Sequence, residues 1–315
     1  MTFWFRATAA MAVFGCVTAG AAPFAYVANE RSGTVSIIDI ASDAVVGDIA
    51  AGKKPRGMTS SRDGRQLFVS DQPANALQVI DIASRKIVGK IDLGESPEGV
   101  YRSPDGKWLS VAIEEDNAVY FIDGASGKRE FQVKTEGKNP EHAVFSRDGK
   151  WVYVSAEEAD TVDVIDVAAR KQVASIKVGK RPRGIGFTPD GRLAYVACEL
   201  ANEVHAIDVA TRKVIAVIPA GVRVNGIAVH PGSGTVYATN GGDGTVSVID
   251  VASNKVVKTI AVGQRPWNMA ITGDGRKLYV ANGRSGSVSV IDTQKLDKLS
   301  DIKVGELPWG VYIPE

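Results

Sequence analysis

The sequence is poor in the residues that most often build redox and metal centres. It has only 2 cysteines and 3 histidines among its 315 residues, and no Cys-x-x-Cys-His motif for haem attachment. A Gly-x-Ser-x-Gly nucleophile elbow and a phosphate-binding loop are also missing. These absences exclude covalent haem attachment at such a motif and give no support for serine-nucleophile or P-loop chemistry.

The chain also lacks an excess of one charge sign. Lys+Arg number 37 and Asp+Glu 36, for a formal net charge of +1. Nucleic-acid-binding domains normally carry a clear basic excess, so we expect no nucleic-acid partner. The hydrophobic content of 44% predicts a globular protein with a large core, and the 33 glycines suit many tight turns.

The amino terminus differs from the rest of the chain. Arg6 is the only charged side chain within residues 1–22, and residues 7–19 are almost entirely apolar or small. Small residues follow at 19–22 and offer cleavage sites. This pattern is typical of a secretory signal peptide and is too short for a good membrane anchor. We therefore expect a signal peptide at 1–22, one domain at 23–315, a periplasmic location and no membrane span after cleavage.

The two cysteines bear on this prediction. A lipoprotein signal at Cys16 is the alternative, although Phe14 fits that pattern poorly. Cleavage before Pro23 would leave Cys198 as the only cysteine, so no intramolecular disulfide could form. Cys198 lies inside an apolar run, which predicts a small buried hydrophobic residue.

A period of about 42 residues runs along the chain and predicts a repeat architecture. An aspartate that closes an apolar run recurs with successive spacings of 42, 42, 43, 42, 42 and 42, at Asp39, Asp81, Asp123, Asp166, Asp208, Asp250 and Asp292. A proline recurs in the same register, with valine at one position: Pro55, Pro97, Pro140, Pro182, Val224, Pro266 and Pro308. Both series contain seven members.

Each unit contains four short apolar runs, as residues 181–218 illustrate. The runs cover 184–188, 193–198, 204–209 and 214–218, and turn signals such as Asp190-Gly191 separate them. Alternating, β-branched runs of this length predict antiparallel strands. Four strands with a period in the low forties are typical of a propeller blade, so we expect an all-β, seven-bladed β-propeller.

The two ends of the domain predict how the ring closes. The mature chain begins on a second-type strand, Phe24–Ala28, and ends on a first-type strand, Trp309–Ile313. One blade is therefore expected to be split, with its innermost strand from the carboxyl terminus. Such closure pairs strands that would otherwise be open edges.

The repeat units resemble the YVTN-type propeller repeats over Phe24 to Ile313. The motifs that carry this resemblance are Tyr26-Val27-Ala28-Asn29, Tyr195-Val196-Ala197 and Tyr279-Val280-Ala281-Asn282. A narrower similarity, to periplasmic propellers associated with pyrroloquinoline quinone (PQQ)-dependent alcohol catabolism, lies in Gly179–Gly184, Gly263–Trp267 and Gly305–Gly310. The narrower resemblance implies a binding or accessory role, a quinoprotein dehydrogenase or its cytochrome as partner, and a monomeric state.

The residues after the proline marks are the candidate ligand-binding residues, because they enter the innermost strands at the channel mouth. They do not repeat: Arg56, Glu98, Glu141, Arg183, Asn225, Trp267 and Trp309. His142 and Asn268 replace the glycine that follows in the other blades. Two indoles could stack on a planar ligand and two arginines could hold its carboxylates, so a PQQ-like quinone is one hypothesis. The alternative is that these junctions are solvated and the aromatic side chains plug the channel.

Charges of both signs gather near the same mouth. Basic residues precede the first strands at Lys53, Lys54, Lys180, Arg181, Arg223 and Arg265. Acidic residues follow the second strands at Glu114, Glu115, Asp116, Glu157, Glu158 and Asp160. This rim could steer a protein partner, or it could be a solvated surface with weak ion pairs.

The sequence favours a non-catalytic protein without excluding an enzyme. A metal site on Glu98, Glu141 and His142 has suitable ligand types, but adjacent residues on a strand point to opposite faces. We therefore expect neither catalytic residues nor a metal. The enzymatic alternatives are a metal-dependent lactonase-like hydrolase and a propeller subunit like that of quinoprotein amine dehydrogenases. A surface or nucleic-acid-binding propeller is the remaining alternative.

Overall fold

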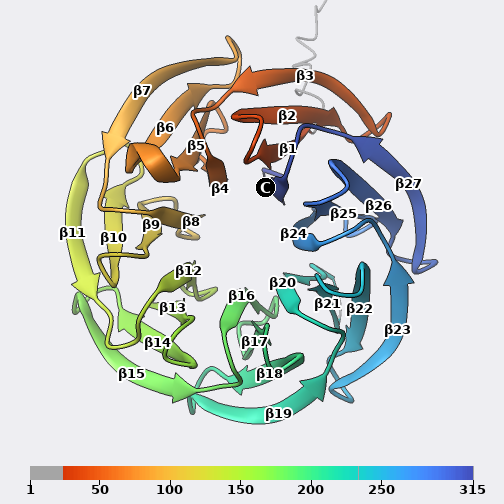
Figure 1. Ribbon diagram of the computed structural model, residues 1–315. Helices are drawn as coiled ribbons and strands as arrows, with labels where there is room; N and C mark the ends of the chain where they lie inside the picture. The colour runs from red at the N-terminus through yellow and green to blue at the C-terminus, as the bar shows by residue number, and fades with distance from the viewer. Residues whose placement is uncertain (1–23, 233, 315) are drawn as a thin grey trace, which may run out of the picture.

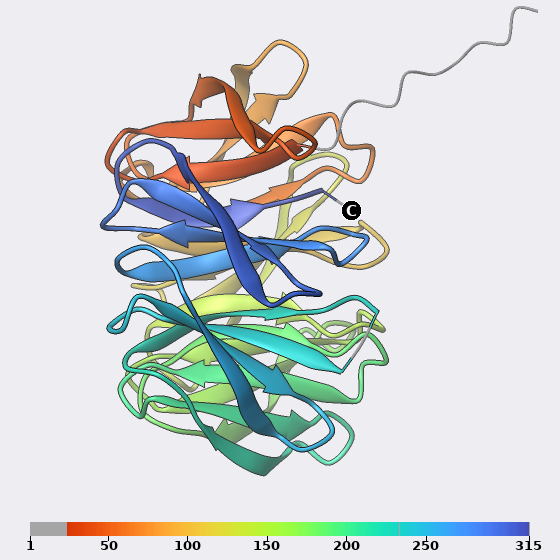
Figure 2. The same cartoon turned by 90° about the vertical axis from the view of Figure 1, so that its right-hand side faces the viewer.

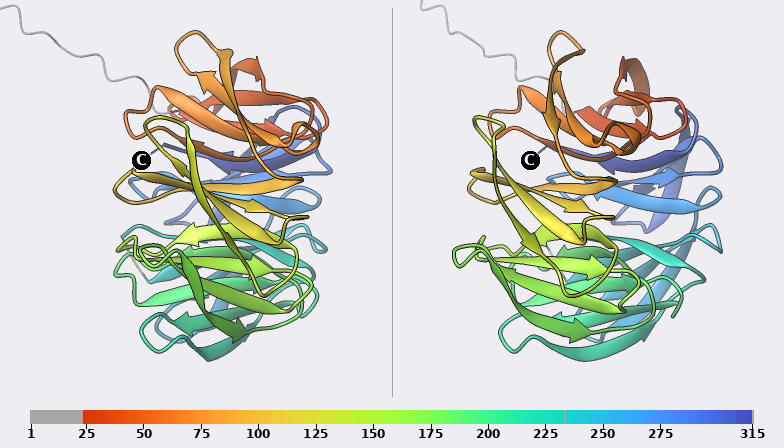
Figure 3. Two further views of the ribbon diagram at one scale, coloured as in Figure 1. Left: turned by 90° about the vertical axis from the view of Figure 1, so that its left-hand side faces the viewer. Right: turned by 60° about the vertical axis from the view of Figure 1, so that its left-hand side comes forward.

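Seven four-stranded antiparallel sheets stand radially around a central channel and form the blades of a propeller (Figure 1). The computed structural model describes residues 24–232 and 234–314, so the predicted signal peptide and the lipoprotein alternative at Cys16 lie outside the described residues. Side views show the blades stacked around the ring (Figures 2 and 3). The prediction of an all-β, seven-bladed propeller is confirmed. No helix among the described residues is long and apolar enough to cross a membrane.

The innermost strand of each blade starts at the proline mark, or at Val224 where proline is missing. These strands are β4 (Pro55–Ser60), β8 (Pro97–Arg102), β12 (Pro140–Phe145), β16 (Pro182–Phe187), β20 (Val224–Val229), β24 (Pro266–Ile271) and β28 (Pro308–Tyr312). Proline fits the first residue of a strand, where its missing N–H costs no ladder hydrogen bond. In β12 the pairing register shifts between Pro140 and Ala143, which frees the two intervening residues from regular pairing.

The second and third strands carry most of the buried residues. The second strands are β1 (Phe24–Asn29), β5 (Gln66–Asp71), β9 (Trp108–Ile113), β13 (Trp151–Ala156), β17 (Leu193–Cys198), β21 (Thr235–Asn240) and β25 (Lys277–Asn282). The third strands are β2 (Thr34–Asp39), β6 (Ala76–Asp81), β10 (Ala118–Asp123), β14 (Thr161–Asp166), β18 (Glu203–Asp208), β22 (Thr245–Asp250) and β26 (Ser287–Asp292). Cys198 is fully buried in β17, as its apolar surroundings predict, and burial raises the pKa of its thiol to about 12.

The fourth strands form the outer wall and alternate between exposed and covered side chains. They are β3 (Ala44–Ala50), β7 (Lys86–Asp92), β11 (Arg129–Lys134), β15 (Lys171–Lys177), β19 (Lys213–Pro219), β23 (Lys255–Ala261) and β27 (Asp297–Lys303). The alternation in these fourth strands is expected where one face of a strand packs on a neighbouring blade and the other faces water. Within the described part of the chain, one 3-10 turn, η1 (Gln72–Ala74), lies between β5 and β6.

The hydrophobic core is a ring of layers between neighbouring blades. In one layer, Tyr195 and Ala197 of β17 pack with Val236 and Ala238 of β21 in the next blade. The Tyr195 hydroxyl donates a hydrogen bond to Asn254 Oδ1 at 2.9 Å, so this buried phenol keeps a polar partner. Each blade therefore buries its faces only against its two neighbours.

The termini close the ring as predicted. The sheet of the split blade has the order β28-β1-β2-β3, and Val27 of β1 pairs with Val311 of β28. The Asp-Gly turns between first and second strands are also confirmed: Gly191 adopts φ +70°, which favours glycine, and Asp190 accepts a hydrogen bond from Thr188 Oγ1 at 2.6 Å. We call the side with these turns the turn face, and the opposite side, where the inner strands begin, the rim face.

Candidate functional site

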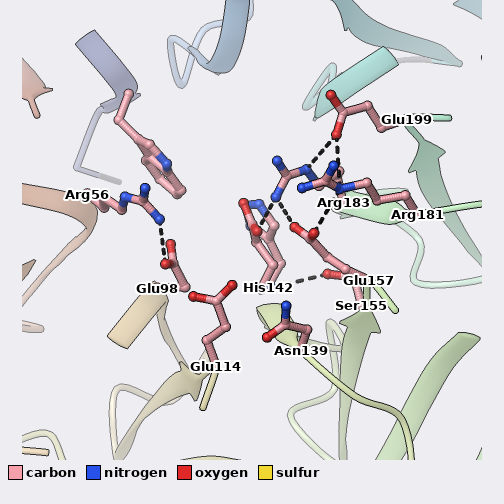
Figure 4. A network of polar contacts seen from close by, with 12 residues as sticks. Arg56, Glu98, Glu114, Asn139, His142, Ser155, Glu157, Arg181, Arg183 and Glu199 are labelled. Carbon is pink, nitrogen blue, oxygen red and sulfur yellow. Dashed lines mark hydrogen bonds and ion pairs between the residues drawn. The ribbon is translucent and has the colours of Figure 1, made fainter. Parts of the chain in front are cut away.

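The predicted ligand-binding residues surround the rim end of the channel, but they do not form one continuous ring. Arg56 and Glu98 lie together in one ion-pair cluster, and Glu141 and Arg183 lie in a second one (Figure 4). Glycine follows most of these positions because the inner strands converge there. A Cβ added to Gly57, for example, would lie 2.4 Å from the carbonyl oxygen of Glu98 in the next strand.

The first cluster centres on Arg56. Its Nε donates to Glu30 Oε2 at 3.0 Å, and its Nη1 donates to Glu98 Oε1. Gln72 Nε2 also donates to Glu98 Oε1, at 2.7 Å. The other carboxylate oxygen of Glu98, Oε2, is buried and has no hydrogen-bond partner among the described residues. Such an orphaned oxygen is expected to carry a proton rather than a charge.

The second cluster centres on Arg183. Its Nη1 donates to Glu141 and to Glu157, and its Nε donates to Glu199 Oε2 at 3.1 Å. Glu157 follows β13 and Glu199 follows β17, the second strands of two neighbouring blades. Three carboxylates from these two blades therefore converge on one guanidinium. Arg183 is thereby saturated with carboxylates of its own chain.

Glu199 is the most heavily paired carboxylate at the rim. Besides Arg183, it lies 3.4 Å from Arg181, 3.4 Å from Arg223 and 2.9 Å from Arg265, and its side chain is only 1% exposed. From the sequence, these last three arginines were expected either on a docking surface or on a solvated rim with weak ion pairs, and Glu199 was not predicted as their partner. The signal was available, since glutamate recurs directly after the second strands at Glu30, Glu114, Glu157 and Glu199.

Burial and neighbouring charges shift the pKa values of the rim carboxyl groups in opposite directions. Burial, reinforced by the charge of Glu141, raises the pKa of Glu98 to about 8 against the opposing effect of Arg56. Burial disfavours ionisation of Glu141 and Glu199 as well, but the combined charges of Arg183 and the neighbouring arginines outweigh it and lower the pKa of both. We therefore assign a proton to Glu98 and a negative charge to the other two at neutral pH.

His142 lies apart from these ion pairs and faces the channel. Its Nδ1 shares a hydrogen bond with the Tyr101 hydroxyl, and its ring stacks on Trp309 with centroids 5.9 Å apart and an interplanar angle of 19°. Its Nε2 is buried without a hydrogen-bond partner among the described residues. Burial lowers the pKa of His142 to about 4, so the imidazole is neutral at physiological pH.

A cavity of about 290 Å³ occupies the channel beside this stack. Apolar side chains of the inner strands line much of it: Met58, Val100, Ile185, Ile227, Met269 and Val311. Polar side chains also line it, among them Arg56, Tyr101, Arg102, His142 and Asn268, whose Nδ2 donates to the Trp309 carbonyl at 3.3 Å. An apolar cavity with a few convergent polar groups is the usual form of a small-ligand site.

The rim residues do not fit a polycarboxylated quinone. The guanidinium groups that should hold its carboxylates, Arg56 and Arg183, are already paired with Glu30 and Glu141. The two indoles do not form a platform either. Trp309 stacks on His142, while Trp267 lies against Gly283 with the Arg265 guanidinium 5.9 Å from its ring centroid.

The remaining candidates are structural in their described contacts. Asn225 is buried in β20, where a Cβ on Gly184 would come within 2.7 Å of its carbonyl oxygen. Glu141 and His142 contact different partners, in keeping with the expected divergence of adjacent strand residues. Among the residues that the structure describes, no group of three or more His, Cys, Asp or Glu side chains could hold a metal ion.

Comparisons with known proteins agree on the propeller architecture. The family model of YNCE-like beta-propellers matches residues 6–107, and that of the 7-bladed beta-propeller lactonases matches residues 167–308. No curated protein matches the sequence.

Solved structures show the same fold at low sequence identity. Hydrazine synthase of Kuenenia stuttgartiensis is 22% identical with a TM-score of 0.74, over 82% of this chain and 92% of that chain. A functionally unknown protein from Desulfotomaculum acetoxidans is 17% identical with a TM-score of 0.81, over 93% and 99%. The dihydro-heme d1 dehydrogenase NirN, in complex with DHE, is 16% identical with a TM-score of 0.72, over 96% and 77%. The chain is thus a seven-bladed β-propeller, similar to YNCE-like propellers over its first blades and to the lactonase-type propellers over its last.

Proposed function

We propose that the protein is a non-catalytic binding propeller of the periplasm that holds a small molecule in its central channel. The observation that carries this proposal is the cavity of about 290 Å³ in the channel, which is lined in part by His142, whose buried Nε2 has no described partner. Leaving a buried polar atom unpaired costs about 1–3 kcal/mol, which a ligand could recover by bonding to it. The site thus favours a ligand with an apolar body and a polar atom at one position.

The biological setting belongs to the same proposal. The phrases Gly179–Gly184, Gly263–Trp267 and Gly305–Gly310 resemble propellers associated with PQQ-dependent alcohol oxidation. We therefore place the protein as an accessory to a periplasmic quinoprotein dehydrogenase or its cytochrome, acting as a monomer. The internally paired rim speaks against the quinone itself as the ligand and for a smaller, less charged molecule.

Native mass spectrometry of protein purified from its own periplasm tests the proposal. The expected result is a mass excess that disappears on mild denaturation and is absent from His142→Gly. That variant places in β12 the residue that the repeat carries in β4, β8, β16, β20 and β28, so it should fold. A bare polypeptide mass in the wild type, together with no binding of any small-molecule probe, would contradict the proposal.

A lactonase-like hydrolase is the second candidate, and the match of the lactonase family model to residues 167–308 favours it. This candidate requires a bound divalent ion. Elemental analysis and a lactone hydrolysis assay with added Ca²⁺, Zn²⁺ or Mn²⁺ separate the two functions. A stoichiometric metal with metal-dependent turnover would favour the hydrolase over the binding protein.

A further inference from the structure

Among the residues that end the seven inner strands, at the turn end of the channel, one is charged. The last residue of each inner strand, or its equivalent in the split blade, lies at this end: Ser60, Arg102, Phe145, Phe187, Val229, Ile271 and Ile313. Arg102 is the only charged member. Because the repeat accepts small, aromatic and aliphatic side chains here, folding of a blade does not require a guanidinium at this position.

Arg102 lies where two cavities of the channel meet. It lines the cavity of about 290 Å³ together with Tyr101, and both residues also line a second cavity of about 330 Å³ nearer the turn face. Arg147 lines the second cavity only, and its Nη2 donates to the Phe187 carbonyl at 3.3 Å. Arg102 therefore borders the space in which a ligand beside His142 would lie.

Arg102 differs from the arginines of the rim in its pairing. Arg56 and Arg183 each bind carboxylates of the chain, whereas within residues 24–232 and 234–314 Arg102 has no side-chain hydrogen bond and no ion pair. A guanidinium presents a rigid fork of donors that matches a carboxylate in a bidentate pair. Arg102 is half-buried beside the cavity and its guanidinium has no described partner, so it could bind one anionic group of a ligand.

The other walls of the cavity define the rest of the ligand. Met58, Ile185 and Met269 supply an apolar surface between Arg102 and the stacked pair of His142 and Trp309. Methionine side chains adapt to ligands of varied shape. A volume of about 290 Å³ is at the lower limit of the roughly 300–1,000 Å³ of small-molecule pockets, so a single ring or a short chain fits best.

We infer that the channel binds small organic monocarboxylates, with the carboxylate on Arg102 and the apolar body between the inner strands, directed toward His142. This inference rests on the proposed function and names the chemical class of its ligand. It also accounts for Arg102, which has no described hydrogen-bond partner, whereas the rim arginines Arg56 and Arg183 bind carboxylates of the chain. A dicarboxylate would place its second charge against apolar walls, so it should bind less well.

Isothermal titration calorimetry on the purified protein tests the inference with four probes: benzoate, hexanoate, the dianion phthalate and the neutral benzamide. Wild type should prefer benzoate or hexanoate to phthalate and benzamide. Arg102→Gln should weaken binding of the monocarboxylates at least about tenfold, since it removes a charge-assisted, hydrogen-bonded pair. Arg147→Gln is the matched control, because it removes one charge from the same end of the channel outside the first cavity. It should leave the affinity nearly unchanged.

Each other outcome decides against the inference. Equal binding of benzamide and benzoate, no loss in Arg102→Gln, or an equal loss in Arg147→Gln would overturn the assigned pair. If Arg102→Gln is misfolded by circular dichroism, Arg102→Ile, which copies the residue of β24, replaces it. Binding of benzamide or a co-purified neutral ligand without carboxylate binding would overturn this inference alone. A channel that binds no probe and carries no ligand from the periplasm would overturn the proposed function as well.

Discussion

The rings of His142 and Trp309 lie nearly parallel in the central channel with centroids 5.9 Å apart, although their strands, β12 and β28, are separated by β4 and β8 on the shorter way round the ring (Figure 1). The stack lies at the third residue of β12 and the second residue of β28. The apolar cavity-lining residues, such as Met58 and Ile185, come later in their strands, nearer the turn face. The channel is thus bridged near the rim and hollow beyond the bridge.

Removing this bridge should open the channel without unfolding the ring. His142→Gly restores the repeat residue, and the loss of one aromatic pair costs only about 0.5–1.5 kcal/mol. We expect a small decrease in Tm and a loss of ligand affinity of at least about tenfold, which a melting curve and calorimetry with benzoate measure. Asn268→Gly is the control, because it restores the same repeat residue in β24 and leaves the His142 edge in place. Equal losses in both variants would contradict a specific role for His142.

Neutralising Glu199 should destabilise the propeller strongly. Its side chain is 1% exposed and faces Arg181, Arg183, Arg223 and Arg265, so Glu199→Gln leaves several guanidinium groups without compensation. Removing one partner from a buried ion pair costs about 3–5 kcal/mol. Urea unfolding of this variant should show a decrease of that order, with little dependence on salt.

Glu158, which follows Glu157 in the loop after β13, is the control position for this measurement. Glu158 is exposed and makes one long contact, from Asn139 Nδ2 at 3.5 Å. Glu158→Gln should change the free energy of unfolding by less than about 0.5 kcal/mol. A similar, small effect of both substitutions would show that the Glu199 cluster is solvated rather than buried.

Glu98 should make the protein less stable as the pH rises. Its pKa is about 8 in the folded chain against a usual value of 4.5, so the folded state binds more protons than the unfolded state between these values. The stability from the protonated carboxyl is therefore complete below pH 4.5 and is lost as the pH rises toward about 8. Glu98→Gln imitates the protonated form and should flatten this loss in melting curves across the pH range. Exposed Glu306, substituted by Gln, is the control, and a decline unchanged in Glu98→Gln would contradict the assigned proton.

His142 should act in the opposite direction at lower pH. Its pKa is about 4 in the folded chain against 6.5, so the unfolded state takes up a proton that the folded state does not. Stability should therefore fall as the pH decreases from 6.5 toward about 4. Comparison of wild type with His142→Gly by urea unfolding at several pH values isolates this contribution. An identical pH dependence of the two proteins would contradict a buried neutral imidazole.

The repeat predicted the fold because it determines backbone positions. The spacing of Asp39 to Asp292 and the prolines located every inner strand, and the ends of the chain predicted that β28 completes the first blade. Side-chain pairing at the rim follows no such period. Arg183 selects Glu141, Glu157 and Glu199 from different strands, and a choice among nearby carboxylates depends on rotamers and burial that the repeat does not encode.

Arg102 was not among the residues that the sequence predicted for the site. Those candidates lie near the start of the inner strands, where charged and aromatic side chains are abundant. Arg102 ends its strand, and it is the only charged residue in that register. Its significance depends on the absence of a described partner and on the two cavities it borders, which only the three-dimensional arrangement shows.

The most direct test of a ligand site in the channel is a long-range ¹H–¹⁵N spectrum of the histidine side chains. Only His142, His205 and His230 contribute, and His142→Gly assigns the signal. We predict that His142 stays neutral from about pH 8 down to about pH 5.5, and that benzoate shifts its Nε2 signal in the wild type but much less in Arg102→Gln. A His142 that titrates near its usual pKa of 6.5 and ignores saturating benzoate would contradict the account.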